Sequence, residues 1–160
     1  MEIKVLPTSL ARLVDYISTA IKHEEKLTPL RARELVLAAD VQEEDMMQYA
    51  DFDHPIEDCY GRKMVHDNGN FEVMVMSWNP NHYSSIHNHG YTEWGVVQAF
   101  GNVHHFIYKE KDGRLIFSKK EISNLPLSEQ YLFQRFGHGP ITRVPYRCIH
   151  YAFLIPYTRL

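Results

Sequence analysis

The chain has 160 residues, the size of one ordinary domain, and 44% of them are hydrophobic and 12% aromatic. This composition is typical of a globular protein and argues against a disordered one. The formal net charge is -3, with 17 lysines and arginines against 20 aspartates and glutamates, so no basic excess is available to bind a phosphate backbone, and nucleic acid is not an expected partner.

The N-terminal part of the chain is predicted to be helical. Its apolar residues recur at three- and four-residue spacing, which gives one apolar stripe, and Thr8 or Ser9 precedes this stripe as a cap. A second helix is predicted to begin at Pro29 with Thr28 as its cap. A third, short helix is expected near Gln42, because the acidic residues there suit the first turn of a helix.

The period of the apolar residues changes near Asp53-His54-Pro55 and is close to two from Tyr60 onward. Residues 71–78 form a strand in which both alternating sets are largely apolar, so we expect both of its faces to be covered. Asp112-Gly113 is typical of a tight hairpin turn. Further strands are predicted within 95–108 (broken at Gly101-Asn102) and at 115–118, 131–133, 141–144 and 148–155.

Many short strands separated by turns are typical of a sandwich or a small barrel, so the predicted fold class is mainly β. No internal repeat or low-complexity linker divides the chain. We therefore expect a single domain over residues 1–160, with a helical part, residues 1–52, packed outside a β-barrel, residues 58–160.

The chain carries no sign of a membrane or secretory protein. No apolar run approaches the roughly 20 residues that span a bilayer, and the N-terminus, MEIKVLPTSL, lacks the apolar core of a secretory signal. Cys59 and Cys148 do not make a disulfide framework, so a cytoplasmic protein without a membrane partner is expected. The unusual residue type is histidine, with ten in the chain and six of them between His66 and His105.

The segment SSIHNHGYTEWG, residues 84–95, places two histidines one residue apart. Residues i and i+2 of a strand face the same side, so His87 and His89 converge while Asn88 points away. Two buried imidazoles are costly unless a partner satisfies both, and a divalent metal does so because neutral imidazole is its commonest nitrogen ligand. The alternative is that both are surface or hydrogen-bonded histidines without a metal.

At this pair the chain resembles the cupin family. The first cupin motif, two histidines around one residue and then a glutamate, matches His87, His89 and Glu93. The second motif, a glycine, a proline and a histidine, matches GPITRVPYRCIH, which ends in His150. The resemblance implies a small β-barrel or jelly roll in which His87, His89 and His150 face one metal.

The segment upstream of the pair narrows the resemblance. Residues 59–89, CYGRKMVHDNGNFEVMVMSWNPNHYSSIHNH, are similar to the cysteine dioxygenase type I family of thiol dioxygenases. That family has a Tyr-x-Arg at the start of a strand, an Asn-x-Phe or Gly-x-Phe, then a Trp, a His, and Ser-Ser-Ile-His with a second His. The matching residues here are Tyr60, Arg62, Asn70, Phe71, Trp78, His82, Ser84, Ser85, Ile86, His87 and His89.

The resemblance implies an enzyme that oxidises a small thiol, with L-cysteine as the leading substrate, to its sulfinic acid with O2. Fe(2+) would be held by His87, His89 and His150, and these neutral ligands would leave the metal positive enough to favour an anionic thiolate. Arg62 would bind the substrate carboxylate through its guanidinium fork. Tyr60 would line the pocket.

Glu93 departs from the thiol dioxygenase pattern, which has Cys or Gly near this point. We favour a position for Glu93 at the edge of the pocket, because a carboxylate ligand would occupy a coordination position that the thiol or O2 needs. The alternative is another metal-dependent cupin enzyme in which Glu93 is the fourth ligand.

The end of the chain is the second departure from the family pattern. The family continues past the third histidine into a last strand with Ser-x-His-x-Tyr, and neither its histidine nor its tyrosine can be placed between His150 and Leu160. Tyr151 and Tyr157 are the tyrosines in this segment, and nothing in the sequence supports either one as a substitute. A catalytically weak cupin that binds a metal or a ligand is therefore a further alternative. A missing last strand would also leave one edge of the barrel unpaired. We expect either a homodimer that covers this edge or a barrel that is partly open.

Overall fold

The computed structural model of this chain describes residues 5–23, 27–80, 82, 84, 92–100, 103–123, 130–134, 141–143 and 148–156. Its helices are α1 (Thr8–His23), α2 (Pro29–Ala39), α3 (Glu43–Met47) and the short 3-10 helix η1 (Ile56–Asp58). Its strands are β1 (Gly61–Asp67), β2 (Glu72–Trp78), β3 (Thr92–Phe100), β4 (Val103–Lys111), β5 (Arg114–Ser123), β6 (Gln130–Gln134), β7 (Ile141–Arg143) and β8 (Cys148–Pro156).

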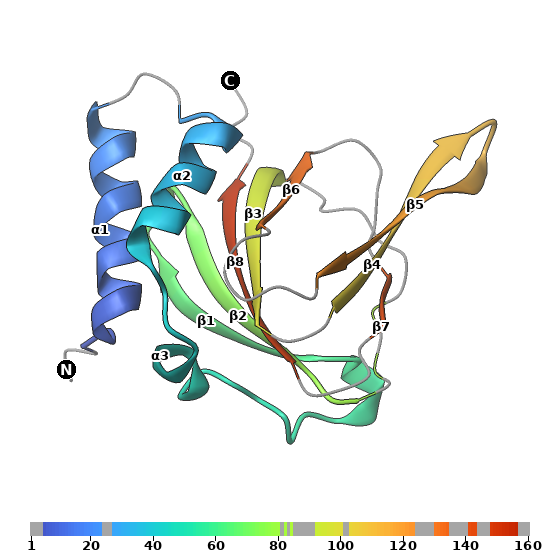
Figure 1. The fold of residues 1–160 in the computed structure, drawn as a ribbon, viewed down its shortest axis with the longest axis horizontal. Coiled ribbons are helices and arrows are strands. Elements are labelled where there is room, and N and C mark those ends of the chain that lie inside the picture. The colour runs from blue at the N-terminus through green and yellow to red at the C-terminus, as the bar shows by residue number, and fades with distance from the viewer. Residues whose placement is uncertain are drawn as a thin grey trace.

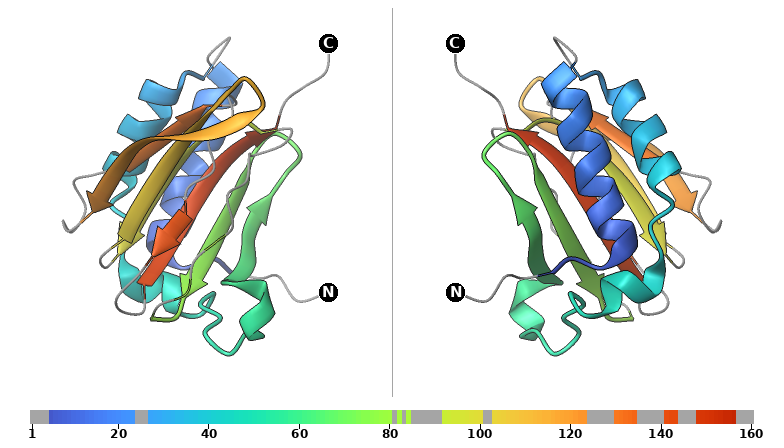
Figure 2. Two further views of the ribbon diagram at one scale, coloured as in Figure 1. Left: turned by 90° about the vertical axis from the view of Figure 1, so that its right-hand side faces the viewer. Right: turned by 90° about the vertical axis from the view of Figure 1, so that its left-hand side faces the viewer.

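The described strands form two antiparallel sheets (Figure 1). The larger has five strands in the order β1-β2-β8-β3-β6, and the smaller has three in the order β5-β4-β7. Helices α1 and α2 cover one face of the five-stranded sheet, and the three-stranded sheet lies toward its other face (Figures 1 and 2). The predicted mainly β fold with N-terminal helices packed outside is thus confirmed. No helix in the described part of the chain is long and apolar enough to cross a membrane.

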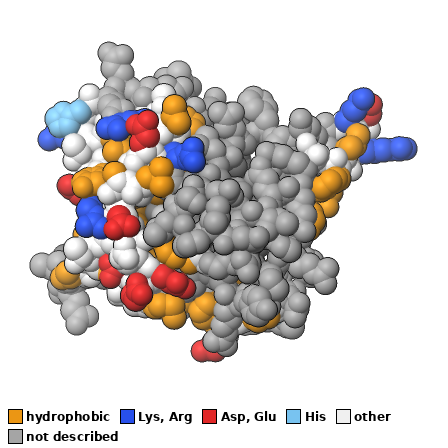
Figure 3. Space-filling view, in the orientation of Figure 1, with side chains coloured by type: hydrophobic (Ala, Val, Ile, Leu, Met, Phe, Trp, Pro, Cys, Tyr) orange, Lys and Arg blue, Asp and Glu red, His pale blue; other side chains and the backbone are white. Residues whose placement is uncertain are grey.

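The main core lies between the helices and the five-stranded sheet. The apolar stripe of α1 packs there with Val73 and Val75 of β2, and all of these side chains are buried in one cluster. Met74 and Trp78 of β2 are also buried, although alternation along the strand directs them to the opposite face. Both faces of β2 are therefore covered, as its sequence predicts. Charged side chains gather on the outer surface of the helices (Figure 3).

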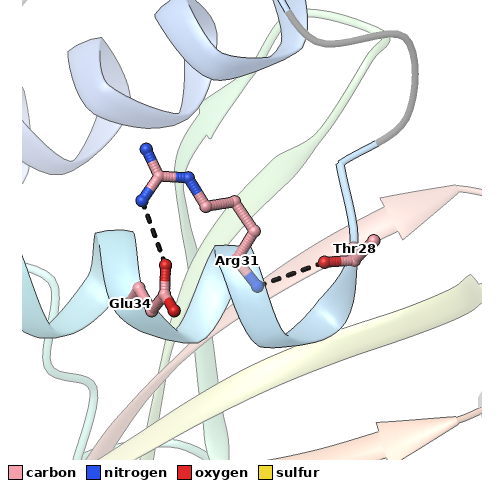
Figure 4. A network of polar contacts seen from close by, with 3 residues as sticks. All are labelled: Thr28, Arg31 and Glu34. Atoms are coloured by element: carbon pink, nitrogen blue, oxygen red, sulfur yellow. Dashed lines mark hydrogen bonds and ion pairs between the residues drawn. The ribbon is translucent and has the colours of Figure 1, made fainter.

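The start of α2 follows its local sequence. The Thr28 hydroxyl accepts a hydrogen bond from the backbone N–H of Arg31 at 3.3 Å, and Pro29 occupies the first helical position (Figure 4). The Arg31 guanidinium then pairs with the carboxylate of Glu34 at 3.1 Å, one turn along the helix. The predicted cap and the predicted helix start are both confirmed.

The β4–β5 hairpin also follows its local sequence. Its turn residues Asp112 and Gly113 have φ angles of 53° and 72°, and positive φ at both positions is what a type I′ hairpin turn requires. Strand β5 extends to Ser123, beyond the predicted end at 118, because its pairing with β4 continues through a register shift at Ile107/Tyr108. Sequence period alone does not detect such an irregular ladder.

The last strand lies inside the larger sheet. Strand β8 pairs with β2 on one side and with β3 on the other. The unpaired barrel edge predicted from the sequence is therefore not β8 itself. Among the described strands, the sheet edges are β1 and β6 in the larger sheet and β5 and β7 in the smaller one.

A polar network joins α1 to α3. The Asp45 carboxylate accepts hydrogen bonds from the Ser9 hydroxyl at 2.6 Å and from the Ser9 backbone N–H at 2.9 Å. The same hydroxyl accepts from the backbone N–H of Gln42 at 3.1 Å. The bonds from Ser9, with a smaller contribution from the nearby Arg12 guanidinium, hold the pKa of Asp45 below its ordinary value of 3.8.

We expect Asp45→Asn to lower the free energy of unfolding at neutral pH by about 1 kcal/mol, the order of one such hydrogen bond. Because the pKa of Asp45 is lower in the folded state than in the unfolded state, the stabilisation is present above the unfolded pKa of about 4. It is lost as the pH falls through the folded pKa.

Urea unfolding of the wild type and of Asp45→Asn, at neutral pH and near pH 3, measures this difference. Asp15→Asn, on the exposed side of α1, is the matched control and should have little effect. A stability difference that does not narrow on acidification would contradict the role of Asp45.

Candidate functional site

The inner face of the five-stranded sheet, meaning the face turned away from the helices, brings predicted site positions into one row. Directly opposed residues of antiparallel strands share a face. The register aligns Arg62 with Met76, Met76 with His150, and His150 with Ala99, across β1, β2, β8 and β3. Val75 is buried in the core beneath the helices, so the neighbouring Met76 and its row belong to the inner face.

Arg62 and His150 thus occupy the same face and are separated by one intervening strand. Neighbouring strands lie about 4.8 Å apart, so the two backbone positions are about 10 Å apart. A small molecule can lie between groups at that separation. The register therefore brings together a predicted carboxylate-binding residue and a predicted metal ligand from opposite ends of the β part of the chain.

The Arg62 side chain is anchored by a neighbouring thioether. Its Nε donates to Sδ of Met74 at 2.8 Å, and Met74 is only 2% exposed. Within the described part of the chain, no ion pair with a carboxylate occupies the Arg62 guanidinium. The contact occupies only Nε, and the remaining donors of the guanidinium fork are available to a ligand.

Tyr60 is held by an aromatic stack. Its ring lies on the ring of Trp78 with centroids 4.8 Å apart and an interplanar angle of 28°. Trp78 has the same alternation as Met74 and Met76, so it lies on the inner face, where it is buried. The stack positions Tyr60 at the end of the Arg62 row where β1 begins.

The segment that leads from β2 toward the predicted histidine pair is tied to the loop before β1. The backbone N–H of His82 donates to the carbonyl of Asn79 at 3.1 Å, which closes a turn. The Asn79 side chain donates to the carbonyl of Phe52 at 2.7 Å. The ring of His82 packs edge-on against the ring of His54 with centroids 5.5 Å apart. Sequence reasoning did not identify His54 as this partner, since no local pattern links the two loops.

His87 and His89 lie outside the described residues, so the structure does not describe their convergence. Glu93 lies on β3 at a register irregularity between Thr92 and Trp94, and its side chain is not described. In the part of the chain that is described, no three His, Cys, Asp or Glu residues are grouped so as to hold a metal. His87 and His89 are not among the residues to which this finding applies.

Strand β8 can be compared with the Ser-x-His-x-Tyr strand of the family, and the histidine is the one residue type of the three that matches. Cys148, His150 and Ala152 occur where Ser-x-His-x-Tyr has its three named residues, and alternation assigns all three positions to the inner face. Tyr151 is directly opposite Val75 and therefore belongs to the helix-covered face. Tyr151 thus does not replace the family's tyrosine on the inner face. His150 therefore has two interpretations. It is either the third metal ligand or the counterpart of the histidine in the family's Ser-x-His-x-Tyr strand.

A sequence model of the family described as cysteine dioxygenase type I matches residues 2–137 of this chain. The match includes Tyr60, Arg62, His87 and His89 and ends before β7 and β8. No curated protein sequence matches the chain.

Solved structures with a similar fold have low sequence identity to this chain. TT1209 from Thermus thermophilus has 10% identity and a TM-score of 0.52, covering 74% of this chain and 99% of that one. Oxalate oxidase in complex with the substrate analogue glycolate has 9% identity and a TM-score of 0.53, covering 83% of this chain and 62% of that one. An RmlC-like cupin protein from Desulfovibrio desulfuricans has 11% identity and a TM-score of 0.47, covering 74% and 99%. At these identities the likeness concerns the fold alone.

The stack on Trp78 gives a testable role to the Tyr60 ring. We expect Tyr60→Leu to lower the free energy of unfolding by about 1 kcal/mol, the order of one aromatic pair. Tyr60→Phe keeps the ring and is the matched control, so its urea-unfolding midpoint should stay close to that of the wild type. Equal stability of the Leu and Phe variants would show that the stack does not stabilise the fold.

Proposed function

This chain belongs to the cysteine dioxygenase type I family of cupin oxidoreductases, and from that premise we propose that it is an Fe(II)-dependent thiol dioxygenase with L-cysteine as its leading substrate. The observation that carries the proposal is the row on the inner face, which aligns Arg62 with His150. The family match covers the Tyr-x-Arg segment and the histidine pair, so both ends of the proposed substrate have a candidate group.

The proposed reaction transfers both atoms of O2 to one sulfur, so that a thiol, RSH, becomes a sulfinic acid, RSO2H, and no further reductant is consumed. Iron, when bound, supplies the activation of O2 that side chains alone do not provide. The proposed ligands are His87, His89 and His150, and a set of neutral imidazoles suits Fe(II). The inner-face position of His150 supports this ligand set, because that face is turned away from the helix-covered core.

Arg62 is proposed to bind the substrate carboxylate. The sulfur of Met74 holds Nε at 2.8 Å, which orients the guanidinium plane and leaves its two terminal nitrogens for a carboxylate. Two parallel charge-assisted hydrogen bonds would fix the acid end of the substrate. The thiol end would then point along the row toward the histidine positions. This arrangement favours a thiol that carries a carboxylate over one that lacks it.

Tyr60 is proposed to contribute its hydroxyl at the edge of the same site. Because its ring is stacked on the buried Trp78, the hydroxyl is held on a rigid support. Its role would be to orient the substrate beside Arg62.

One observation favours a second candidate function, a cupin that binds a metal or a small molecule with weak turnover. The inner-face position where the family has the tyrosine of Ser-x-His-x-Tyr is Ala152 in β8. A methyl group cannot donate the hydrogen bond that a phenol donates. Under this candidate the protein binds iron and a thiol but consumes little O2.

The first test of the proposed function is oxygen uptake by the iron-loaded protein with cysteine, homocysteine, 3-mercaptopropionate and cysteamine. We expect Arg62→Leu to raise KM for the three carboxylate-bearing thiols by about tenfold to a hundredfold, because a charge-assisted pair of hydrogen bonds is lost. KM for cysteamine, which has no carboxylate, should change little.

Met74→Leu provides a finer variant, since it keeps the side-chain volume and removes the sulfur acceptor. It should raise KM for cysteine by less than Arg62→Leu does, with kcat nearly unchanged. Met47→Leu, at an exposed position of α3 outside the row, is its control. If Arg62→Leu raises KM for cysteamine as much as KM for cysteine, the proposed binding of the substrate carboxylate by Arg62 is contradicted. If the iron-loaded protein takes up no oxygen with any of the four thiols, the proposed dioxygenase activity is overturned. The second candidate function, a cupin that binds a metal or a small molecule, then remains.

The two interpretations of His150 predict different metal contents. If His150 is a ligand, as proposed, His150→Ala purified from iron-supplemented cells should lose iron to the same extent as His87→Ala. Elemental analysis of the purified variants measures this. Iron retained at the wild-type level together with a lowered kcat would instead assign His150 to the role of the last-strand histidine.

A further inference from the structure

Two histidines from different loops lie in ring contact outside the row that contains the candidate site residues. His54 belongs to the loop before β1, and His82 belongs to the segment that follows β2. Their ring centroids are 5.5 Å apart, and the two ring planes are inclined at 77°. The hydrogen bond of 2.7 Å from the Asn79 side chain to the Phe52 carbonyl ties the same two segments together. The fold therefore holds these two imidazoles next to each other.

The ring nitrogens of this pair are incompletely satisfied. Nε2 of His54 and Nδ1 of His82 are buried, and neither has a hydrogen-bond partner among the described residues. The other ring nitrogen of His54, Nδ1, lies 2.9 Å from the carbonyl oxygen of Pro55. Because a carbonyl oxygen only accepts, Nδ1 carries the proton and Nε2 keeps a lone pair in the neutral ring. A buried polar atom without a partner is costly, so both nitrogens require an explanation.

One metal ion would satisfy both nitrogens. An ion such as Zn2+ lies about 2.0–2.1 Å from an imidazole nitrogen and therefore about 3.2 Å from the centre of the ring. Two rings on a tetrahedral ion then have centres about 5.2 Å apart, whereas two rings at a right angle on one ion have centres about 4.5 Å apart. The observed separation of 5.5 Å fits the tetrahedral angle better.

The hydrogen bond between His54 and Pro55 is of the kind that supports a metal ligand. A metal-bound histidine usually donates its second ring N–H to a carboxylate, a backbone carbonyl or water, which fixes the tautomer and the orientation of the ring. The bond from Nδ1 of His54 to the Pro55 carbonyl does this. Residues 51–58, which contain His54, also include four carboxylates and no basic residue. Their negative charge favours the approach of a divalent cation.

We propose that His54 and His82 form a second metal site, which binds Zn2+ through Nε2 of His54 and Nδ1 of His82. These residues differ from the ligands proposed for iron. The described part of the chain groups no third His, Cys, Asp or Glu with them, so water or a small anion completes the coordination. With two protein ligands in place of the four of a structural zinc site, we expect a Kd of roughly 1–100 µM.

The ion connects two segments that lead to the candidate site. The loop with His54 continues to Tyr60 and Arg62 at the start of β1, and the segment with His82 continues toward the predicted histidine pair, residues 87 and 89. An ion bound to both segments stabilises the folded chain, because the unfolded chain has no preformed site. The proposed role of the zinc ion is therefore to hold these two segments together.

Equilibrium dialysis of the purified full chain against Zn2+ tests the site without an assay of activity. The background is the double variant His87→Ala/His89→Ala, which removes two of the ligands predicted for iron. We expect this background to bind one zinc ion, and His54→Gln or His82→Gln added to it should raise the zinc Kd at least tenfold. His23→Gln, at an exposed position of α1, is the matched control and should bind zinc as the background does. Circular dichroism checks that each variant is folded.

Nitrogen-15 NMR of the histidine rings extends the test to the unaltered chain, in case a variant does not fold. Zinc should shift the signals of Nε2 of His54 and Nδ1 of His82, while Nδ1 of His54 stays protonated. The proposal is overturned if these signals do not move with zinc up to about 1 mM. It is also overturned if His54→Gln binds zinc as tightly as the background, and a buried water is then the partner of the two nitrogens. Neither measurement depends on oxygen uptake, so failure of this proposal and failure of the proposed dioxygenase are distinguishable.

Discussion

Burial of β2 on both faces is the constraint on which the rest of the structure depends. Along this strand, Val73 and Val75 pack beneath the helices, while Met74 and Trp78 are buried on the opposite side. A strand covered on both faces cannot shift its register by one residue, because every side chain would then exchange faces. The positions of β1 and β8, which pair directly with β2, are fixed by the same requirement.

The positions of the candidate site residues depend on their pairing with β2. Arg62 and His150 come to one face only because each pairs with Met76, one through β1 and the other through β8. Around this row, the sulfur of Met74 holds the Arg62 guanidinium and the Trp78 ring holds Tyr60. The same residues that fill the inner face therefore also orient the polar groups presented there. A site built on sheet positions is more rigid than one built on loops, which suits a reaction that must keep one small thiol in place.

Features whose cause lies within a few residues could be predicted from the sequence. Thr28-Pro29 predicted a capped helix start, and Asp112-Gly113 predicted a type I′ turn, because capping and positive φ are local requirements. The family resemblance likewise rested on a contiguous segment, residues 59–89. The contact of His54 with His82 and the irregular ladder of β5 were not predicted, since both depend on pairing between segments that are separate in the sequence.

Residue types and their local spacing were enough to indicate the mainly β fold with outer helices. The resemblance of residues 59–89 to a known family indicated the cysteine dioxygenase type I family and implied that Arg62 is a carboxylate-binding candidate. Only the tertiary structure decided that β8 lies between β2 and β3, that His150 shares a face with Arg62, and that Tyr151 belongs to the other face. The physical reason is that side-chain alternation gives two equivalent faces to any isolated strand. Which of them becomes the inner face is settled only when neighbouring strands and the helices bury one of the two.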